Sequence, residues 1–341
     1  MSAASTDSAA SHQHYFLYRA LEPLAAFLAD PEIIEISVNK PSHVYVERLG
    51  ADHMEFHSIP KLTSAEIANM GERVAATTNQ FISPANPVLS AALPSGERIQ
   101  FVLPPASPCG GAVSIRKQVV GDFSLEDYRD RGGFDRVSVA IGRISDGIRS
   151  LIELLLGDDI HGFVRGAIAN RLSILISGGT SSGKTTFLNA CLKAVDMHER
   201  IITLEDTREL YPPQPNTVHL LASKGDQGTA SATVQTLLEA SLRMRPDRLF
   251  VGEVRGGEAF SFLRAINTGH PGSMSTVHAD TPHGAYEQLA MMVMQSGLSA
   301  AYPKADLISY IRSVIPIVIQ LRRHGGKRGV SEIYFSAMDK P

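Results

Sequence analysis

The sequence predicts an α/β fold, with a mostly parallel sheet in the C-terminal half and an α+β domain before it. The chain has 341 residues, which is more than one typical domain, and suggests two. Its hydrophobic share of 43% is enough to build ordinary globular cores. From about residue 171 onward, continuously apolar segments alternate with helical patterns, as in a sheet with both faces covered by helices.

The composition excludes several classes of protein. A net charge of −3 argues against a broad nucleic-acid-binding surface. Cys109 and Cys191 form no C-x-x-C pair, so we expect neither a disulfide framework nor a thiolate zinc site, which suits a reducing cytoplasm. Residues 1–14 lack the basic start and apolar core of a signal peptide, and we expect them to be disordered. Residues 314–321 are too short to span a bilayer and predict a buried strand.

An α+β domain is expected at 15–120, because helical and strand patterns are mixed there. Alternating strand patterns meet at Pro41-Ser42, and Thr63 with Glu66 predicts a capping box at the start of a helix. The expected helices are 18–30 and 64–78, and the expected strands are 32–40, 43–48, 93–105 and 112–118.

A linker with its own helices is expected at 121–160. Its first part, "GDFSLEDYRDRGGFDR", is charged and punctuated by glycine, and residues 144–157 have a helical pattern. The second domain then covers 161–341. Its expected strands are 171–177, 200–206, 247–253 and 272–279, and its expected helices are 183–194, 232–244, 258–269 and one that begins at Thr281-Pro282.

The stretch "LISGGTSSGKTTFLNACL" predicts a nucleoside triphosphate site. Gly178, Gly183, Lys184 and Thr185 fit G-x-x-x-x-G-K-[ST] between a strand and a helix. Glycines let backbone N–H groups converge on phosphates, the helix N-terminus adds positive charge, Lys184 supplies a full charge, and Thr185 offers a hydroxyl to Mg²⁺. The expected binding residues are Gly178, Gly179, Thr180, Ser181, Ser182, Gly183, Lys184, Thr185 and Thr186.

Hydrolysis also needs carboxylates near the terminal phosphate, and two strand ends supply them. The strand "IITLED" ends in Glu205-Asp206, and "LFVGE" ends in Glu253. Carboxyl ends of parallel strands face the ligand crevice, so we expect Glu205 and Glu253 at the site. Either acid could instead simply begin a turn.

Arginine and histidine residues near these strands are further candidates. Arg243 and Arg245 could meet phosphate charge in the same chain or across a subunit interface, or they could form a solvated basic turn. We interpret His278 as a sensor of the phosphate state, although a structural role stays open. No third ligand at a recognised spacing accompanies His270 and His278, so a metal site of their own is not expected.

Four segments in order resemble the motifs of a known family. "SGGTSSGKTT", "ITLEDTREL", "SLRMRPDRLFVGEVRGGEA" and "TGHPGSMSTVHAD" are similar to the Walker A, Asp-box, Walker B and His-box motifs of the type II/type IV secretion ATPase superfamily. Within it, the VirB-eleven type of traffic ATPase of type IV secretion systems is the most similar branch. The tetracysteine zinc insertion of many type II members is absent from this sequence.

The resemblance implies a RecA-like C-terminal domain and a separate N-terminal domain, with ATP and Mg²⁺ bound between them. It implies a homohexamer that is cytoplasmic and peripheral to the inner membrane and contacts other type IV secretion subunits. Mg²⁺-dependent ATP hydrolysis would drive pilus biogenesis and substrate translocation, with nucleic acid only as a transported substrate.

The resemblance also assigns residue roles. Lys184 and Thr185 would hold nucleotide and Mg²⁺, Glu205 and Glu253 would be the acidic pair, Arg245 would contact phosphate, and His278 would couple phosphate state to motion. Arg116 best matches the N-terminal-domain arginine that reaches the phosphates, and Arg131 or Arg136 matches less well. If Arg116 reaches the nucleotide, ATP binding should close the two domains. The segment after Glu253 lacks the neighbouring aspartate, so Mg²⁺ would depend on Thr185 or water.

Three other functions remain open. A P-loop phosphotransferase would need an acceptor pocket and an arginine lid, which these motifs do not resemble. A RecA-like nucleic-acid motor would need a basic or aromatic lining, yet the chain has no Trp and a net negative charge. Lys184, Glu205 and Glu253 together argue against a nonhydrolysing scaffold.

Overall fold

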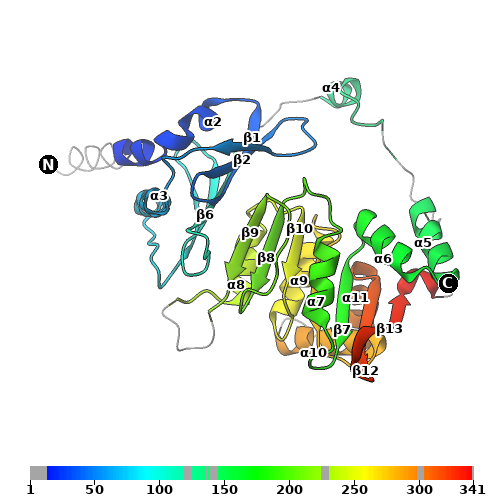
Figure 1. The fold of residues 1–341 in the computed structure, drawn as a ribbon. Helices are drawn as coiled ribbons and strands as arrows, with labels where there is room; N and C mark the ends of the chain where they lie inside the picture. The colour runs from blue at the N-terminus through cyan, green and yellow to red at the C-terminus, as the bar shows by residue number, and fades with distance from the viewer. Residues whose placement is uncertain are drawn as a thin grey trace.

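The computed structural model describes residues 14–118, 124–135, 137, 145–223, 230–297 and 303–339. These residues form two units, each built on its own sheet (Figure 1). Most of the expected disordered N-terminus lies outside the described residues, as does Arg136.

The N-terminal unit is a six-stranded antiparallel sheet packed against helices. Its strand order is β3-β2-β1-β6-β5-β4. The strands are β1 (Ile33–Lys40), β2 (His43–Arg48), β3 (Glu55–Ser58), β4 (Val88–Ala92), β5 (Arg98–Val102) and β6 (Ala112–Arg116). The core of this unit includes side chains from helix 14–20 and from α3 (Ser64–Thr77).

The structure divides the helix expected at 18–30 into three pieces. Residues 14–20 are helical, a 3-10 turn follows at Glu22–Leu24, and α2 spans Ala25–Ala29. Pro23 explains the break, because proline has no N–H to donate within a continuous helix. Helix α3 begins as expected, with the Thr63 hydroxyl accepting from the Glu66 N–H at 3.2 Å.

The C-terminal unit is a seven-stranded sheet of order β13-β12-β7-β11-β10-β8-β9. Every neighbouring pair is parallel except the β12–β13 hairpin. The strands are β7 (Ile174–Gly178), β8 (Ile201–Glu205), β9 (Thr217–Leu221), β10 (Arg248–Val251), β11 (Met274–Val277), β12 (Ile317–His324) and β13 (Lys327–Phe335).

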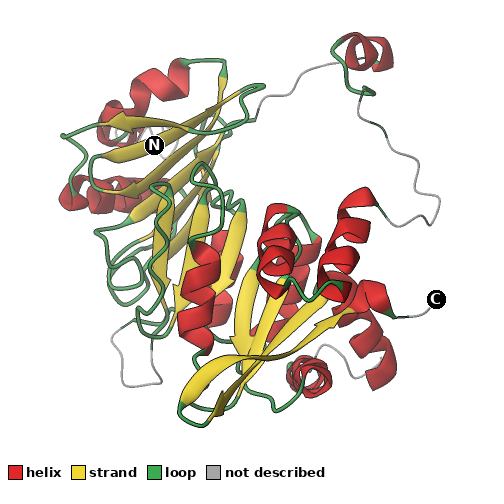
Figure 2. Ribbon diagram, turned by 45° about the vertical axis from the view of Figure 1, so that its right-hand side comes forward, coloured by secondary structure: helices red, strands yellow, loops and turns green. Residues whose placement is uncertain are grey.

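Helices cover both faces of this sheet (Figure 2). One face packs against α8 (Val234–Ser241), α9 (Glu258–Asn267), α10 (Pro282–Gln295) and α11 (Lys304–Val314). The other packs against α5 (Asp146–Leu156), α6 (Ile160–Ala169) and α7 (Lys184–Leu192). Helix α5 falls in the expected linker, yet its Leu151 is buried in the core of the C-terminal unit.

Two details around this sheet refine the sequence prediction. Val314 ends helix α11, so only the later part of the strand expected at 314–321 is extended, and β12 begins after Pro316. Within the expected linker, α4 (Leu125–Asp130) lies away from both sheets and starts with a Ser124–Asp127 capping box (Figure 1).

A buried guanidinium joins the two units. Arg200 is 0% exposed, and its Nη1 donates to the Oδ1 atoms of Asn39 and Asn216. Its Nε donates to the Met244 carbonyl at 2.9 Å. Because Asn39 belongs to β1 and Asn216 precedes β9, this cluster fixes one sheet against the other.

The carboxyl of Glu35 lies beside this cluster and is 3% exposed. Burial raises its pKa to about 8, against the opposing charges of Arg200 and Arg116. Glu35 is therefore protonated near neutral pH in the folded chain.

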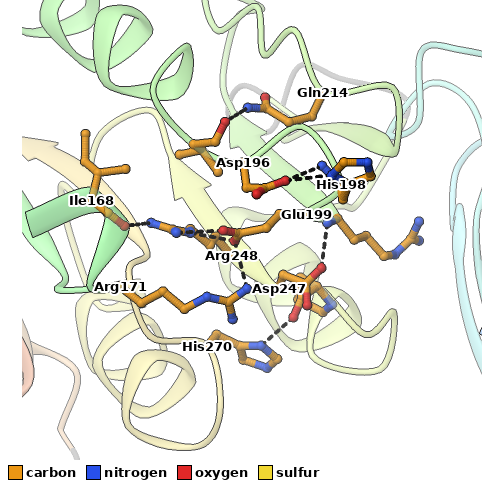
Figure 3. Close-up of polar contacts among 12 residues, drawn as sticks. Ile168, Arg171, Asp196, His198, Glu199, Gln214, Asp247, Arg248 and His270 are labelled. Carbon is orange, nitrogen blue, oxygen red and sulfur yellow. Dashed lines mark hydrogen bonds and ion pairs between the residues drawn. The ribbon is translucent and has the colours of Figure 1, made fainter. Parts of the chain in front are cut away.

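A buried ion pair fixes the start of β10. Arg248 donates from Nε and Nη2 to the two carboxylate oxygens of Glu199, both at 2.7 Å, and from Nη1 to the Ile168 carbonyl (Figure 3). Arg171 contacts the same carboxylate at 3.3 Å. This ion pair therefore ties the end of α6 to the segment before β8.

We expect Glu199→Leu to lower the free energy of unfolding by about 3–5 kcal/mol, because it leaves the Arg248 charge buried without its partner. Equilibrium urea denaturation measures the change. Asp146→Asn, at the exposed Arg149–Asp146 pair, is the control and should cost less than about 1 kcal/mol. Adding Arg248→Met to Glu199→Leu should recover part of the loss; no recovery would mean that the buried charge is not the cause.

Glu35 should make stability depend on pH. Its pKa is raised on folding, so the folded chain binds more protons than the unfolded chain between its ordinary value and about 8. Stability should therefore fall as pH rises through that window, by at most about 1.4 kcal/mol per pH unit. Glu35→Gln should flatten this slope in denaturation measured from pH 5 to 8, whereas Glu66→Gln at an exposed position should not. Equal slopes in wild type and Glu35→Gln would contradict the assignment.

Candidate nucleotide-binding site

The phosphate loop lies between β7 and α7, as the sequence predicts. Gly183 has φ +95° and Ser181 has φ +61°, so the loop turns sharply before the helix begins at Lys184. A Cβ at Gly178 would meet the Ser182 Oγ at 2.5 Å and the Leu321 carbonyl at 2.7 Å. Only glycine fits at this position, and it lets the loop stay close to β12.

The Lys184 ammonium contacts the carbonyls of its own loop. Its Nζ donates to the Gly178 carbonyl at 2.9 Å and to the Gly179 carbonyl at 3.1 Å. Lys184 is 7% exposed, and burial lowers its pKa, partly offset by the charge of Glu253. A buried ammonium of this kind is available to exchange loop carbonyls for phosphate oxygens.

A continuous row of polar contacts runs from Lys184 to the acidic strand ends. His278 Nδ1 lies 3.3 Å from Lys184 Nζ, and its Nε2 lies 3.1 Å from Glu253 Oε1. A neutral imidazole with its proton on Nε2 satisfies both contacts, because Lys184 then donates to Nδ1 and Nε2 donates to Glu253. Arg255 continues the row, donating to Glu253 and to Asp206 at 2.8 Å each.

A cavity of about 190 Å³ opens beside this row and is lined by Thr185, Glu205, Asp206, Glu253 and Arg255. Its hydroxyl and carboxylate oxygens are the donors that Mg²⁺ prefers. The described residues contain no group of three His, Cys, Asp or Glu side chains that could hold a metal alone. Thr185 and these carboxylates could hold a Mg²⁺ ion only together with ligands from outside the chain, such as phosphate oxygens and water.

Glu205 and Asp206 lie differently, although both line the cavity. Glu205 is 5% exposed, and its Oε1 accepts from the N–H groups of Glu209 and Leu210 at 2.8 Å each. Burial raises its pKa, and these two hydrogen bonds oppose the rise. Its Oε2 has no hydrogen-bond partner among the described residues. Glu205 thus orders the loop after β8, whereas Asp206 pairs with Arg255.

Two predicted phosphate-contacting arginines lie elsewhere. Arg116 and Arg245 line a second cavity of about 400 Å³, together with Glu35, Arg98 and Arg243. Arg245 also pairs with Glu47 of β2. Arg245 precedes β10, at its amino end, whereas the phosphate loop follows the carboxyl end of β7. The structure therefore does not bring Arg116 or Arg245 to Lys184 of the same chain.

The remaining predicted residues divide between the loop and other places. Gly179, Thr180 and Ser182 line a cavity of about 330 Å³ with residues of β12, and Thr186 lies in the first turn of α7. Arg131 follows α4, and His270 contacts the Pro246 carbonyl at 2.8 Å, away from the loop.

Sequence reasoning did not single out Arg255 or give Asp206 a role. The spacing offered a signal for both, since Arg255 is two residues after Glu253 and Asp206 immediately follows Glu205. Only their contact across two strand ends shows that they belong to one site.

Known proteins match this chain over nearly its whole length. A family model described as type II/IV secretion system protein matches residues 19–327. The type IV secretion system protein VirB11 of Bartonella quintana is 40% identical over 327 residues, covering 92% of this chain and 91% of the relative. VirB11 of Brucella suis is 36% identical, covering 94% of this chain and 90% of the relative.

A solved structure also matches. It is the VirB11 ATPase from the Brucella suis type IV secretion system in complex with sulphate, with a TM-score of 0.90, 35% sequence identity and coverage of 97% of both chains. The predicted resemblance and fold class are therefore confirmed. The chain belongs to the type II/IV secretion system protein family.

Proposed function

We propose that this chain is an ATPase that couples ATP hydrolysis to type IV secretion, in pilus biogenesis and substrate translocation. One observation carries the proposal: Lys184, His278 and Glu253 form a continuous set of contacts at the phosphate loop. Relatives named as type IV secretion system proteins, and a solved relative named as an ATPase, support it.

Lys184 and the loop N–H groups would bind the phosphates. On binding, the ammonium leaves the carbonyls of Gly178 and Gly179 and contacts the β- and γ-phosphate oxygens. The N-terminus of α7 adds partial positive charge at the same place. Mg²⁺, held with the nucleotide beside Thr185, would supply charge neutralisation for the phosphates.

Glu253 is the best-placed residue to orient the attacking water. Its Oε1 contacts His278 and its Oε2 contacts Arg255, so the carboxylate is fixed at both oxygens. A fixed carboxylate at the mouth of the loop can accept a water proton. Glu205 is less suited, because it is more deeply buried than Glu253 and its hydrogen bonds are to the loop after β8 rather than to the row of contacts that begins at Lys184.

His278 would connect the phosphate state to the rest of the chain. It contacts both the lysine that would bind phosphate and the acid that would bind water. When Lys184 moves to a phosphate, the imidazole loses one of its two partners. Loss of this contact would change the position of His278 and, with it, the position of the segment after β11.

We further propose a homohexamer in which Arg116 and Arg245 contact the nucleotide of a neighbouring chain. Their distance from Lys184 in one chain supports contact between chains rather than closure within one chain. A head-to-tail contact that closes into a ring would bring this arginine-rich cavity to the next acidic cavity. The same argument applies less directly to Arg131, which lies in the segment between the units.

The chain would act at the cytoplasmic side of the inner membrane, as a peripheral partner of other type IV secretion subunits. No helix among the described residues is long and apolar enough to cross a bilayer. We propose an N-terminal domain at 15–120, a linker with helices at 121–160 and an ATPase domain at 161–341, with α5 of the linker packed onto the ATPase domain. The phosphotransferase and nucleic-acid motor readings are not favoured, and nucleic acid would enter only as transported substrate.

Lys184→Ala should reduce Mg²⁺-dependent ATP turnover about 100-fold or more, because the phosphates lose their charge partner. Glu253→Gln should reduce turnover by a similar factor while ATP affinity stays near wild type, because the amide cannot accept a proton from water. Phosphate release and equilibrium binding of a fluorescent ATP analogue measure the two effects. Wild-type turnover in Lys184→Ala would overturn the ATPase assignment, and normal turnover in Glu253→Gln would move the role to Glu205.

Mixing two inactive variants tests whether the arginine acts between chains. The two variants, Arg116→Ala and Lys184→Ala, are coexpressed in equal amounts so that they form mixed rings. Where an Arg116→Ala chain supplies Lys184 and its neighbour, a Lys184→Ala chain, supplies Arg116, the site between them has both residues intact. Turnover should return to about one quarter of the wild-type value if each site takes Lys184 and Arg116 from different chains. Each variant alone is the control. Mixed rings as inactive as the single variants would show that Arg116 does not act on a neighbour.

A further inference from the structure

A buried glutamine contacts the segment that carries His278. Gln320 on β12 is 1% exposed, and its Nε2 donates to the Ala279 carbonyl at 3.0 Å. The hydroxyl of Ser177 on β7 donates to the same carbonyl at 3.3 Å. Ala279 directly follows His278, so two side chains converge on the peptide group next to the histidine.

The strand register explains why these two donors meet. Gln320 pairs with Ser177 across the parallel β12–β7 ladder, one residue before β7 ends at the phosphate loop. On the other side of β7, β11 ends at Val277. A second contact supports the same segment, because Arg322 of β12 donates to the Asp280 carbonyl at 3.1 Å. Strand β12 therefore holds two successive residues after His278.

The side chain of His278 needs such support. It is 49% exposed, and its two contacts, at 3.3 Å to Lys184 and 3.1 Å to Glu253, are longer than strong charge-assisted hydrogen bonds. Side-chain contacts of this kind do not by themselves fix a half-exposed ring. Its position depends on the backbone that carries it, and that backbone is held at Ala279.

The bonding of Gln320 points to the same role. Its Oε1 is buried and has no hydrogen-bond partner among the described residues, which is unfavourable for an acceptor removed from water. An apolar side chain of similar size would avoid this cost but could not donate to Ala279. The neutral amide N–H donor is thus what glutamine supplies at this position and an apolar side chain of similar size would not.

We propose that Gln320 is a positioning residue for ATP hydrolysis: it holds the Ala279 carbonyl and so keeps the His278 imidazole between Lys184 and Glu253. The proposal rests on the role proposed above for His278. It extends the site to β12, a strand outside the four sequence motifs.

The test replaces Gln320 by methionine, which keeps an unbranched chain of similar volume and removes the donor. Gln320→Met should lower kcat for ATP about tenfold and change KM for ATP less than about twofold, because the phosphate-binding loop stays intact while His278 loses its position. In a His278→Ala background, Gln320→Met should have no further effect on kcat, since nothing remains to be positioned.

Gln214 provides a matched control. It is also buried, its Nε2 donates to the carbonyls of Leu192 and Val195, and its Oε1 has no partner among the described residues. Gln214→Met should lose comparable stability in urea denaturation and keep wild-type kcat. If Gln320→Met does not fold, Ser177→Ala removes the other donor to Ala279 and should lower kcat in the same direction by a smaller factor.

Three results would overturn the inference while leaving the ATPase function intact. They are a loss of kcat in Gln320→Met that persists in the His278→Ala background, an equal loss in Gln214→Met, and a rise in KM without a fall in kcat. A wild-type kcat in His278→Ala would also remove the inference, together with the role of that histidine. Failure of the ATPase function itself would appear instead as hydrolysis by Lys184→Ala.

Discussion

The guanidinium of Arg200 is the constraint on which the arrangement of the two units depends. A fully buried cation is costly unless its donors are satisfied, and Arg200 satisfies them with Asn39 of the N-terminal unit and with Asn216 and Met244 of its own unit. Separating the two units would remove the Asn39 contact from this buried charge. The N-terminal sheet is therefore fixed at the amino ends of β8, β9 and β10, and the phosphate loop at their carboxyl edge stays open.

This placement separates charge along the C-terminal sheet. Acidic side chains gather after the strands, where Asp206, Glu205 and Glu253 line one cavity, and arginines gather before them, where Arg116 and Arg245 line another. The chain as a whole carries a net charge of only −3, so the amino-acid composition does not reveal that acidic and basic side chains gather in separate cavities. Two ends of opposite charge suit the head-to-tail contact proposed between copies, in which the arginines of one chain would complete the phosphate contacts of the next.

The sequence predicted those features that depend on neighbouring residues. The phosphate loop, the parallel strands around it and the family were found because each motif is contiguous. Strands β3, β4, β9 and β13 were missed because the first three have only four or five residues and β13 is largely exposed, so their sequence patterns are weak. Arg255 and Gln320 were not singled out because their partners, Asp206 and the Ala279 carbonyl, are distant in the chain. Sequence spacing also does not show that Arg116 lies away from Lys184.

The contacts of Lys184 with its own loop have a consequence for the time that product stays bound. The carbonyls of Gly178 and Gly179 act as an internal competitor for the ammonium, so any ligand that uses Lys184 must first displace them. If Lys184 binds phosphate as proposed, this competition would weaken the binding of ATP and of ADP alike, since both present a β-phosphate, and would lower the apparent affinity by the fraction of loops that are ready to bind. Once the γ-phosphate had left, return of the ammonium to the carbonyls would favour departure of ADP. The resting loop would thus help to empty the site for the next round.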